Sequence, residues 1–318
     1  MQRWQGFRTN KGALGGLGFL VLLCGVTSLA WTLAPHDPWS IVSRPFTPPT
    51  WEFPLGTDTL GRDILAAIIH GGRVSLLIGL ASAAMSTVVG VLMGAIAAYY
   101  GGWVDEVLMR ITEFFQIVPG FVLALVLIAI FTPSLVAIVF AIGFVGWPAM
   151  ARLVRAEFLS LRTREFVLAA QALGAGDAKL MFRTILPNAM PVIIVYSSLL
   201  VATSILFESS LSFLGLGDPN YISWGYMIGA SRSVLRLAWW MPVFPGLAIL
   251  LTVLSINLVG DGLNDALNPK SNRALAVTAS EQPPDSGAQA HAEGKEEQCQ
   301  RHNRIKGSFR LTRTSWSP

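Results

Sequence analysis

The sequence predicts an all-α membrane protein with six transmembrane helices and a polar tail. Hydrophobic residues make up 53% of the chain and charged residues only 13%, whereas an ordinary soluble domain has about 25% charged residues. The charges also avoid long stretches, because residues 74–100, 117–151, 184–207 and 237–260 contain no Asp, Glu, Lys or Arg. About 20 apolar residues in a helix cross a bilayer core about 30 Å thick, so each stretch is long enough to span.

The first span is expected close to the N-terminus, where residues 12–34 are uncharged. Lys11 before this stretch and Ser28-Leu29-Ala30 within it also fit a signal peptide with a cleavage site. The apolar part is longer than the core of a typical signal peptide, which favours a retained membrane anchor.

The run 117–151 is too long for one helix and contains Pro133. Because proline ends or kinks a helix, two spans joined by a short turn are expected here. The six predicted helices cover residues 13–34, 74–100, 117–131, 134–151, 187–208 and 241–262.

The basic residues between the spans predict the orientation, since cytoplasmic loops carry an excess of Lys and Arg. Three such residues precede the first span, six lie within 152–183, and eight lie in the tail. Six spans place these regions on one side, so both termini are expected in the cytoplasm. Segments 35–73 and 209–240 carry three and two basic residues and are expected outside. Segment 101–116 is expected inside by the number of spans, although it has one basic and three acidic residues. The orientation is kept because the charges of the other loops support it.

The expected organisation follows from these spans. An N-terminal cytoplasmic segment with the first helix covers 1–34, an external loop covers 35–73, and a core with five helices covers 74–265. Residues 269–318 are polar and without apolar periodicity, so a disordered cytoplasmic tail is expected.

A basic, glycine-broken segment between the fourth and fifth spans is predicted to form a bent helical hairpin. Its first helix, 164–173, would be only about 15 Å long and cannot span the bilayer. Gly174 is suited to end that helix in a left-handed conformation, and Asp177 is suited to cap a second short helix. Pro187 is expected in the first turn of the next span.

The hairpin offers a small apolar surface formed by Ala169, Ala170 and Leu173, with cations around it. A short helix of this kind fits a groove on a partner protein. The alternative is an amphipathic helix lying on lipid headgroups, although the alanines provide little apolar bulk for anchoring. The residues alone leave both interpretations open.

The stretch "AAQALGAGDAKLMFRTILPN", residues 169–188, resembles the cytoplasmic coupling loop of ABC-importer permeases. The chain departs from the motif at Leu168, where the family has Glu, and at Thr184, where it usually has Ile. Glu165 is a candidate for the missing acidic role. The ATPase-coupling residues that the resemblance implies are Glu165, Ala169, Ala170, Leu173, Gly174, Asp177, Leu186 and Pro187.

Three further stretches, 53–79, 211–228 and 244–269, resemble the second permease subunit of dipeptide, oligopeptide and nickel importers. The resemblance covers about residues 10–269 and implies the type I ABC-importer permease fold in the inner membrane. It also implies a homologous second permease subunit, two ABC ATPase subunits and an external substrate-binding protein. The cargo would be a di- or oligopeptide or a nickel complex, and no contact with nucleic acid is expected.

The chain is not expected to be an enzyme, because it lacks a G-x-x-x-x-G-K-[ST] phosphate loop. The resemblance instead places ATP and Mg in the partner ATPases, with no cofactor in this chain. No catalytic residue and no metal ligand is proposed, and Cys24 and Cys299 show no spacing typical of a disulfide or metal site.

Two stretches outside the membrane are candidates for a contact surface or a gate. The segment 56–63 contains Asp58, Arg62 and Asp63, which would contact the binding protein or the partner permease, or form a locally satisfied turn with an Asp–Arg pair. The segment 213–225 contains Gly215 and Gly217 and is expected to be an irregular loop that gates the pathway or docks a partner.

Tryptophans and carboxylates at the span ends complete the candidate residues. Trp224 fits the gate, but Trp224, Trp239 and Trp240 together also fit an interfacial aromatic belt. Glu208 either lies on the pathway or bonds the backbone of 211–217. Asp261 and Asp265 at the end of the last helix oppose its dipole, so arginines of 152–164 are expected beside them.

The rival hypothesis is a secondary transporter or channel that works alone. Such a protein needs ionisable residues in mid-membrane for ion coupling, and the predicted spans contain almost none. An inverted repeat is not evident either.

Overall fold

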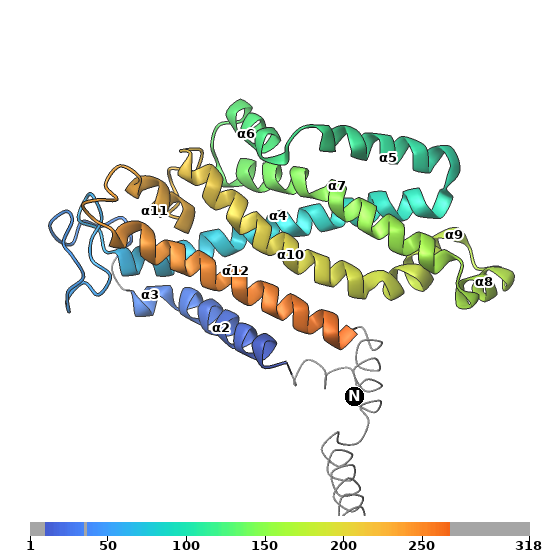
Figure 1. Cartoon of the computed structure of the whole chain (residues 1–318), viewed down its shortest axis with the longest axis horizontal. Helices are drawn as coiled ribbons and strands as arrows, with labels where there is room; N and C mark the ends of the chain where they lie inside the picture. Colours follow the sequence, from blue (N-terminus) through green and yellow to red (C-terminus); the bar gives the residue numbers. More distant parts are fainter. Residues whose placement is uncertain (1–9, 35–36, 268–318) are drawn as a thin grey trace, which may run out of the picture. The chain divides into compact units, whose positions relative to one another are not determined.

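The computed structural model describes residues 10–34 and 37–267, which form helices joined by loops, the longest of them before α4 (Figure 1). No strand occurs in these two ranges, where only two isolated β-bridges are found. The helices are α2 (Lys11–Ser28), α3 (Ala30–Leu33), α4 (Ile64–Tyr100), α5 (Gly102–Ile117), α6 (Gly120–Ile130), α7 (Leu135–Arg162), α8 (Glu165–Ala172), α9 (Asp177–Lys179), the π-helical turn η1 (Leu180–Ile185), α10 (Leu186–Phe213), α11 (Trp224–Ser231) and α12 (Trp240–Leu267).

Five helical segments of the described chain are long and apolar enough to cross a membrane. They are α2, α4, α7, the continuous segment from α9 through α10, and α12; the bent pair α5 and α6 provides a sixth. The predicted all-α membrane fold is confirmed. The predicted tail, 269–318, lies outside the described residues.

The predicted boundary of the external loop, 35–73, is wrong because α4 begins at Ile64. The Asp63 carboxylate accepts a hydrogen bond from Leu65 N at 2.9 Å and caps the helix. Arg73 lies inside α4 and donates to the backbone carbonyls of Thr27 and Ser28 at the end of α2. The charged side chain of Arg73 therefore connects α4 to α2 and does not indicate a loop.

The third span also differs from its predicted range, 117–131. Residues Gly102–Ile117, expected as a loop, form α5, and α6 has only 11 residues, which reach about 16 Å. The two helices meet at an angle of 83°, around Val118 and Pro119. The third crossing is therefore a broken helix.

The remaining spans are longer than predicted, since charged residues continue the helices. The fourth, predicted as 134–151, extends through the basic residues to Arg162. The fifth runs as one 37-residue segment from Asp177 to Phe213, and Pro187 is the second residue of its α10 part, in the first helical turn as predicted. The sixth covers Trp240–Leu267.

Small residues bring α4 and α7 into close contact. Every buried residue of α4 is Ala, Gly or Ser, except Ile64 and Ile78. A Cβ atom at Gly90 would lie 2.6 Å from Met150 Cβ, and one at Gly94 would lie 2.3 Å from the Ala151 carbonyl oxygen. Close backbone approach through small residues is typical of membrane helices, and here both helices belong to the same chain.

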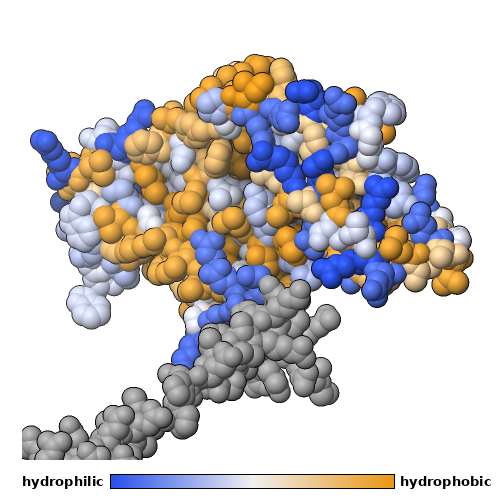
Figure 2. Space-filling view, turned by 45° about the vertical axis from the view of Figure 1, so that its right-hand side comes forward, coloured by the Kyte–Doolittle hydropathy of each residue, from blue (hydrophilic) through white to orange (hydrophobic). Residues whose placement is uncertain are grey.

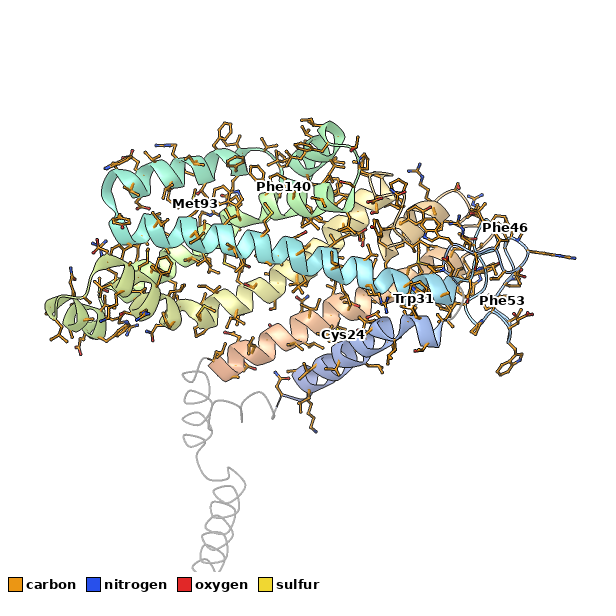
Figure 3. All side chains as sticks on the ribbon, turned by 180° about the vertical axis from the view of Figure 1, so that it is seen from behind. Cys24, Trp31, Phe46, Phe53, Met93 and Phe140 are labelled. Carbon is orange, nitrogen blue, oxygen red and sulfur yellow. The ribbon has the colours of Figure 1, made fainter. Side chains whose placement is uncertain are left out.

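The first helix packs against the last. A Cβ atom at Gly16 of α2 would lie 2.8 Å from the Ser255 carbonyl oxygen of α12. At the start of α2, Asn10 caps the helix through Ala13 N and donates from Nδ2 to the Asp265 carboxylate at 3.2 Å. These contacts favour the membrane anchor over a cleaved signal peptide. Cys24 is exposed on α2 (Figure 3).

The surface of the chain separates into apolar and polar regions. A broad hydrophobic area covers the middle of the bundle, and hydrophilic patches gather toward the end with α8 and α9 (Figure 2). In each of the five single-helix spans, at most 44% of the most apolar window is buried within the chain. Much apolar surface is therefore left for lipid or for a partner subunit.

We expect Gly94→Ala to destabilise the bundle, because the added methyl would overlap the Ala151 carbonyl oxygen. The cost expected for overpacking is about 1–3 kcal/mol. Gly246→Ala is the matched control, since a Cβ at Gly246 has no heavy atom within 4 Å. Thermal unfolding in detergent should show a lower midpoint for Gly94→Ala only; equal midpoints would contradict the packing described.

Candidate functional site

The segment between α7 and α10 forms a helical hairpin, 164–186, at one end of the bundle, opposite the end that carries α11 (Figure 1). Its first helix, α8, ends at Ala172, and Gly174 follows with φ +79°. Gly174 N donates to Gln171 O at 2.9 Å and Ala175 N donates to Ala170 O at 3.2 Å. The predicted left-handed glycine at this helix end is confirmed.

The second arm begins one residue earlier than predicted. Gly176 is the N-cap of α9, and Asp177 is its first residue. The Asp177 carboxylate instead accepts a hydrogen bond from Tyr99 Oη in the last turn of α4, at 2.8 Å. Asp177 therefore fastens the hairpin to the bundle.

Apolar side chains on the inner face hold the hairpin in place. Val167 of α8 and Leu180, Met181 and Ile185 of η1 are buried in one hydrophobic cluster with Phe158 and Leu161 of α7. Ala170 and Leu186 are partly buried against the same cluster. Ala170, predicted as part of the outer surface, thus helps to attach the hairpin.

The outer face of α8 is apolar and exposed. Phe166, Ala169 and Leu173 are spaced three and four residues apart and share this face; Leu173 is 89% exposed and Phe166 42%. Leu168, at the position of the missing motif Glu, is 52% exposed, and Phe182 of η1 is 43% exposed. We call the face formed by Phe166, Ala169 and Leu173 the hairpin patch. The exposed residues of the segment also include Arg164, Glu165, Asp177, Lys179 and Arg183, and Pro187 just after it is exposed too.

A charged pair near the hairpin joins α5 to α7. Both guanidinium nitrogens Nε and Nη2 of Arg155 donate to the Asp105 carboxylate, at 2.5 and 2.6 Å. Arginines of 152–164 were expected beside Asp261 and Asp265, but the ion pairs found among the described residues include neither carboxylate. Asp265 accepts from Asn10, and Asp261 is exposed.

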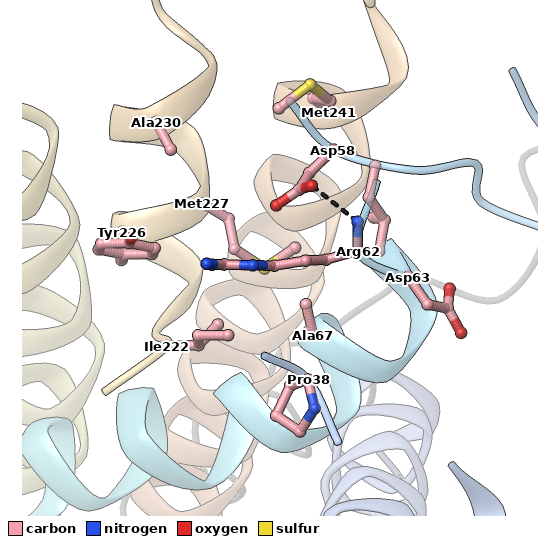
Figure 4. A pocket seen from close by; sticks show the side chains of 11 residues that line it. Pro38, Asp58, Arg62, Asp63, Ala67, Ile222, Tyr226, Met227, Ala230 and Met241 are labelled. Atoms are coloured by element: carbon pink, nitrogen blue, oxygen red, sulfur yellow. Dashed lines mark hydrogen bonds between the residues drawn. The ribbon is translucent and has the colours of Figure 1, made fainter. Parts of the chain in front are cut away.

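At the opposite end of the bundle, the segment 56–63 forms a tight turn. Asp58 Oδ1 accepts hydrogen bonds from the backbone N–H groups of Leu60 and Arg62, both at 2.8 Å. The Arg62 guanidinium carbon lies 4.7 Å above the Trp39 ring, and in Figure 4 this side chain extends toward Tyr226. The turn is satisfied locally, as one interpretation expected, but through the Arg62 backbone, and no Asp58–Arg62 ion pair occurs among the described residues.

A cavity of about 30 Å³ adjoins Asp58, Arg62 and Asp63 (Figure 4). This volume has room for a water molecule or two. Arg62 Nε is buried without a hydrogen-bond partner in the described ranges. The cavity is too small for a peptide, so the role of these three residues as a contact surface stays a prediction.

Two of the three tryptophans considered for an aromatic belt lie in the protein interior. Trp224 is fully buried, and its indole N–H donates to Ile68 O at 3.0 Å. Trp240 is also buried and donates to Thr57 O at 3.2 Å, whereas Trp239 is exposed. The predicted aromatic belt is therefore wrong for Trp224 and Trp240.

Glu208, near the end of α10, is the centre of a buried polar cluster that contacts the start of α11. Its carboxylate is 1% exposed and accepts hydrogen bonds from the hydroxyls of Ser223 at 2.6 Å, Ser212 at 2.8 Å and Ser209 at 3.4 Å. Ser223 is also the N-cap of α11. The structure supports the structural role considered for Glu208, although its partners are serine side chains and not the backbone of 211–217.

Glycines allow the chain to fold closely around this cluster. Gly215 has φ +88° at the turn after α10, and a Cβ atom at Gly217 would lie 2.7 Å from Ser212 Oγ. A Cβ at Gly225 would lie 2.6 Å from Ser209 Cα. Gly215 and Gly217 thus shape the loop over Glu208, while gating by this loop stays a prediction.

Among the described residues, no group of three or more His, Cys, Asp or Glu side chains is placed to hold a metal ion. Sequence reasoning missed Tyr99, Asp105, Ser212, Ser223 and Phe182. Tyr99 sits at the end of a predicted span, where a polar contact was foreseeable. The pairs Asp105–Arg155 and Glu208–Ser223 join residues distant in the chain, and a single sequence carries no signal for them.

Comparisons with known proteins agree with this architecture. Residues 90–273 match the model of the family described as "Binding-protein-dependent transport system inner membrane component". The chain is 44% identical over 280 residues to the di/tripeptide transport system permease protein DppC of Pseudomonas aeruginosa, covering 85% of this chain and 92% of the relative. It is 38% identical over 270 residues to the glutathione transport system permease protein GsiD of Pectobacterium atrosepticum, covering 84% and 90%.

We expect Gly174→Ala to loosen the hairpin, since a left-handed conformation costs a residue with a side chain about 1–2 kcal/mol. Gly176→Ala is the matched control, because Gly176 has φ −69° and open space around it. Hydrogen exchange of the peptide 164–180 should accelerate in Gly174→Ala and stay unchanged in Gly176→Ala. Equal exchange in both variants would contradict the left-handed turn.

We expect Glu208→Leu to lower the free energy of unfolding by about 1–3 kcal/mol, since it leaves buried hydroxyl donors without their acceptor. Glu208→Gln keeps an acceptor oxygen and should lose less. Thermal unfolding of both variants measures the difference. A Glu208→Leu protein as stable as the parent would show that the serine cluster contributes nothing.

Proposed function

The chain belongs to the family of binding-protein-dependent transport system inner membrane components, and on that basis we propose that it is a permease subunit of an ATP-driven peptide importer. It would form half of the translocation pathway, and a homologous permease subunit would form the other half. Two ABC ATPases would bind ATP and Mg on the cytoplasmic side, and an external substrate-binding protein would deliver the cargo. Both termini would be cytoplasmic.

The hairpin patch is the observation that carries this proposal. A side chain such as Leu173, 89% exposed at the end of the bundle, is costly to leave in water, since burying a leucine side chain is worth about 1.5–3 kcal/mol. Exposed basic residues of the hairpin, Arg164, Lys179 and Arg183, favour a cytoplasmic location of the patch by the positive-inside rule. An ATPase groove would cover the patch and receive α8.

The attachment of the hairpin suits the transmission of force. Its second arm continues through η1 into α10 as one segment from Asp177 to Phe213, about 55 Å long. Glu208 near the far end of that segment contacts Ser223, the N-cap of α11. Displacement of the hairpin by ATP-driven closure would therefore reach the external loops by rigid-body movement, as alternating access requires.

A peptide is the proposed cargo, because the relatives are named as transporters of di/tripeptides, dipeptides and glutathione. Transport of a nickel complex stays a prediction from the sequence resemblance. The rival hypothesis, a secondary transporter working alone, leaves the hairpin patch without a purpose.

We expect Leu173→Asp to break ATPase attachment, because the charge would have to enter an apolar contact. With burial of the leucine worth about 1.5–3 kcal/mol, retention of the ATPase should fall by about tenfold or more. Leu235→Asp, 51% exposed near the opposite end, is the matched control. Co-purification from membranes and ATP-driven peptide uptake in proteoliposomes measure both variants.

Retention of the ATPase and full uptake by Leu173→Asp would contradict the docking site. Uptake by the isolated chain, driven by a proton gradient alone, would support the rival hypothesis.

A further inference from the structure

A second cavity lies between α7, α10 and α12, toward the hairpin end of the bundle. It has a volume of about 450 Å³, within the range of about 300–1,000 Å³ typical of small-molecule sites. Its polar lining comes from Tyr196 and Ser198 of α10 and from Asn257, Asp261 and Asn264 of α12.

The polar residues of α12 form one stripe. Asn257, Asp261 and Asn264 are spaced four and three residues apart, so they project from the same face of the helix. The same face continues toward the α11 end with Leu250 and Leu254, which are 59% and 49% exposed. Polar character is therefore confined to the part of α12 that borders the cavity.

Close packing of two helices forms the inner wall of this cavity. A Cβ atom at Gly260 would lie 2.4 Å from Ser198 Oγ, so α12 and α10 touch at this glycine. Gly260 is itself part of the cavity lining, so this contact between α12 and α10 closes the cavity on one side.

Part of the cavity lies at membrane depth. A Cβ atom at Gly16 would contact Ser255 O and Leu258 Cβ, at 2.8 and 3.2 Å, so α2 crosses beside this part of α12. Asn257 is therefore level with residues inside the first span, and Asp261 lies about one turn closer to the hairpin end. Polar groups at such depth are tolerated only where they face protein or a water-filled space.

Asp261 has the properties of a cation-binding group. Its side chain borders the open cavity and is exposed. The two ion pairs of the described chain, Arg155–Asp105 and Arg110–Glu113, do not include it. The amides of Asn257 and Asn264 and the hydroxyl of Tyr196 offer neutral donors and acceptors around this carboxylate.

We propose that this cavity is the chain's own section of the solute pathway at its cytoplasmic end, where Asp261 receives the ammonium group of a peptide. The neighbouring amides and hydroxyls would hydrogen-bond to the peptide units. A single carboxylate at an open, water-accessible cavity gives a weak, transient site, which suits a pathway that must release its solute. This inference rests on the proposed function.

Cysteine labelling tests whether the cavity contains water. Asn257→Cys, Asp261→Cys and Asn264→Cys are made singly in a chain carrying Cys24→Ser and Cys299→Ser, assembled with its importer partners. The control chain carries Cys299→Ser alone and keeps Cys24, which is exposed in the apolar middle of the first span and away from the cavity. A charged, water-soluble thiol reagent is applied to inside-out membrane vesicles.

We expect the three cavity cysteines to react at least about tenfold faster than Cys24, since only a thiol in contact with water forms the reactive thiolate. Dialanine, added at saturating concentration with the binding protein and ATP, should slow labelling at position 261. Rates equal to that of Cys24 would mean that lipid fills the cavity. Labelling of the isolated chain but not of the assembled importer would mean that the partner permease fills it. Either result overturns the proposal.

Peptide uptake tests the role of the carboxylate. Asp261→Asn should reduce dialanine uptake by about tenfold, as expected for loss of a hydrogen-bonded charge interaction, and Asp261→Glu should restore most of it. Unchanged uptake in Asp261→Asn would overturn the ammonium site. A parent importer that binds its ATPases but moves no peptide, while the cavity cysteines still react, would instead contradict the proposed cargo.

Discussion

The close contact between α4 and α7 is the constraint on which the rest of the structure depends. Gly90 and Gly94 of α4 leave no space for a side chain against Met150 and Ala151 of α7, so both helices keep one register over a long distance. That register places Tyr99 next to Asp177 and brings Arg155 of α7 to Asp105 of α5. The position of the hairpin therefore follows from packing inside the membrane.

The two ends of α10 are held in different ways. At the hairpin end, the segment is fixed by apolar burial of Leu180, Met181 and Ile185, and η1 adds a π-helical turn, a feature often found at functional sites. At the α11 end, the segment is fixed by Glu208 and its serine hydroxyls. Apolar contacts without fixed direction tolerate small shifts, whereas short hydrogen bonds do not, so movement of α10 is expected to carry α11 with it.

The number and apolar character of the spans were predictable from the charge-free runs, and the turn at Gly174 from its flanking residues. The limits of the spans were not, because charged residues such as Arg73 and Arg155 remain inside helices by bonding to carbonyls or carboxylates of the same chain. The break between α5 and α6 was not predicted, because the four charged residues of the amphipathic helix α5 are typical of a loop. The third span was therefore expected to begin only after α5. The prediction of an interfacial position for Trp224 failed for a similar reason. Its indole N–H donates a hydrogen bond to Ile68 O within the protein and therefore needs no contact with water.

Polar and apolar groups are distributed oppositely at the two ends of the bundle, and this difference indicates where partners act. At the α11 end the carboxyl group of Glu208 is enclosed by its own chain and accepts hydrogen bonds from the hydroxyls of Ser212 and Ser223. At the hairpin end the apolar side chain of Leu173 stays in water and the carboxylate of Asp261 borders an open cavity. Exposed leucine favours a protein partner and an exposed carboxylate favours a polar solute. The hairpin end thus offers surfaces for both a partner and a cargo.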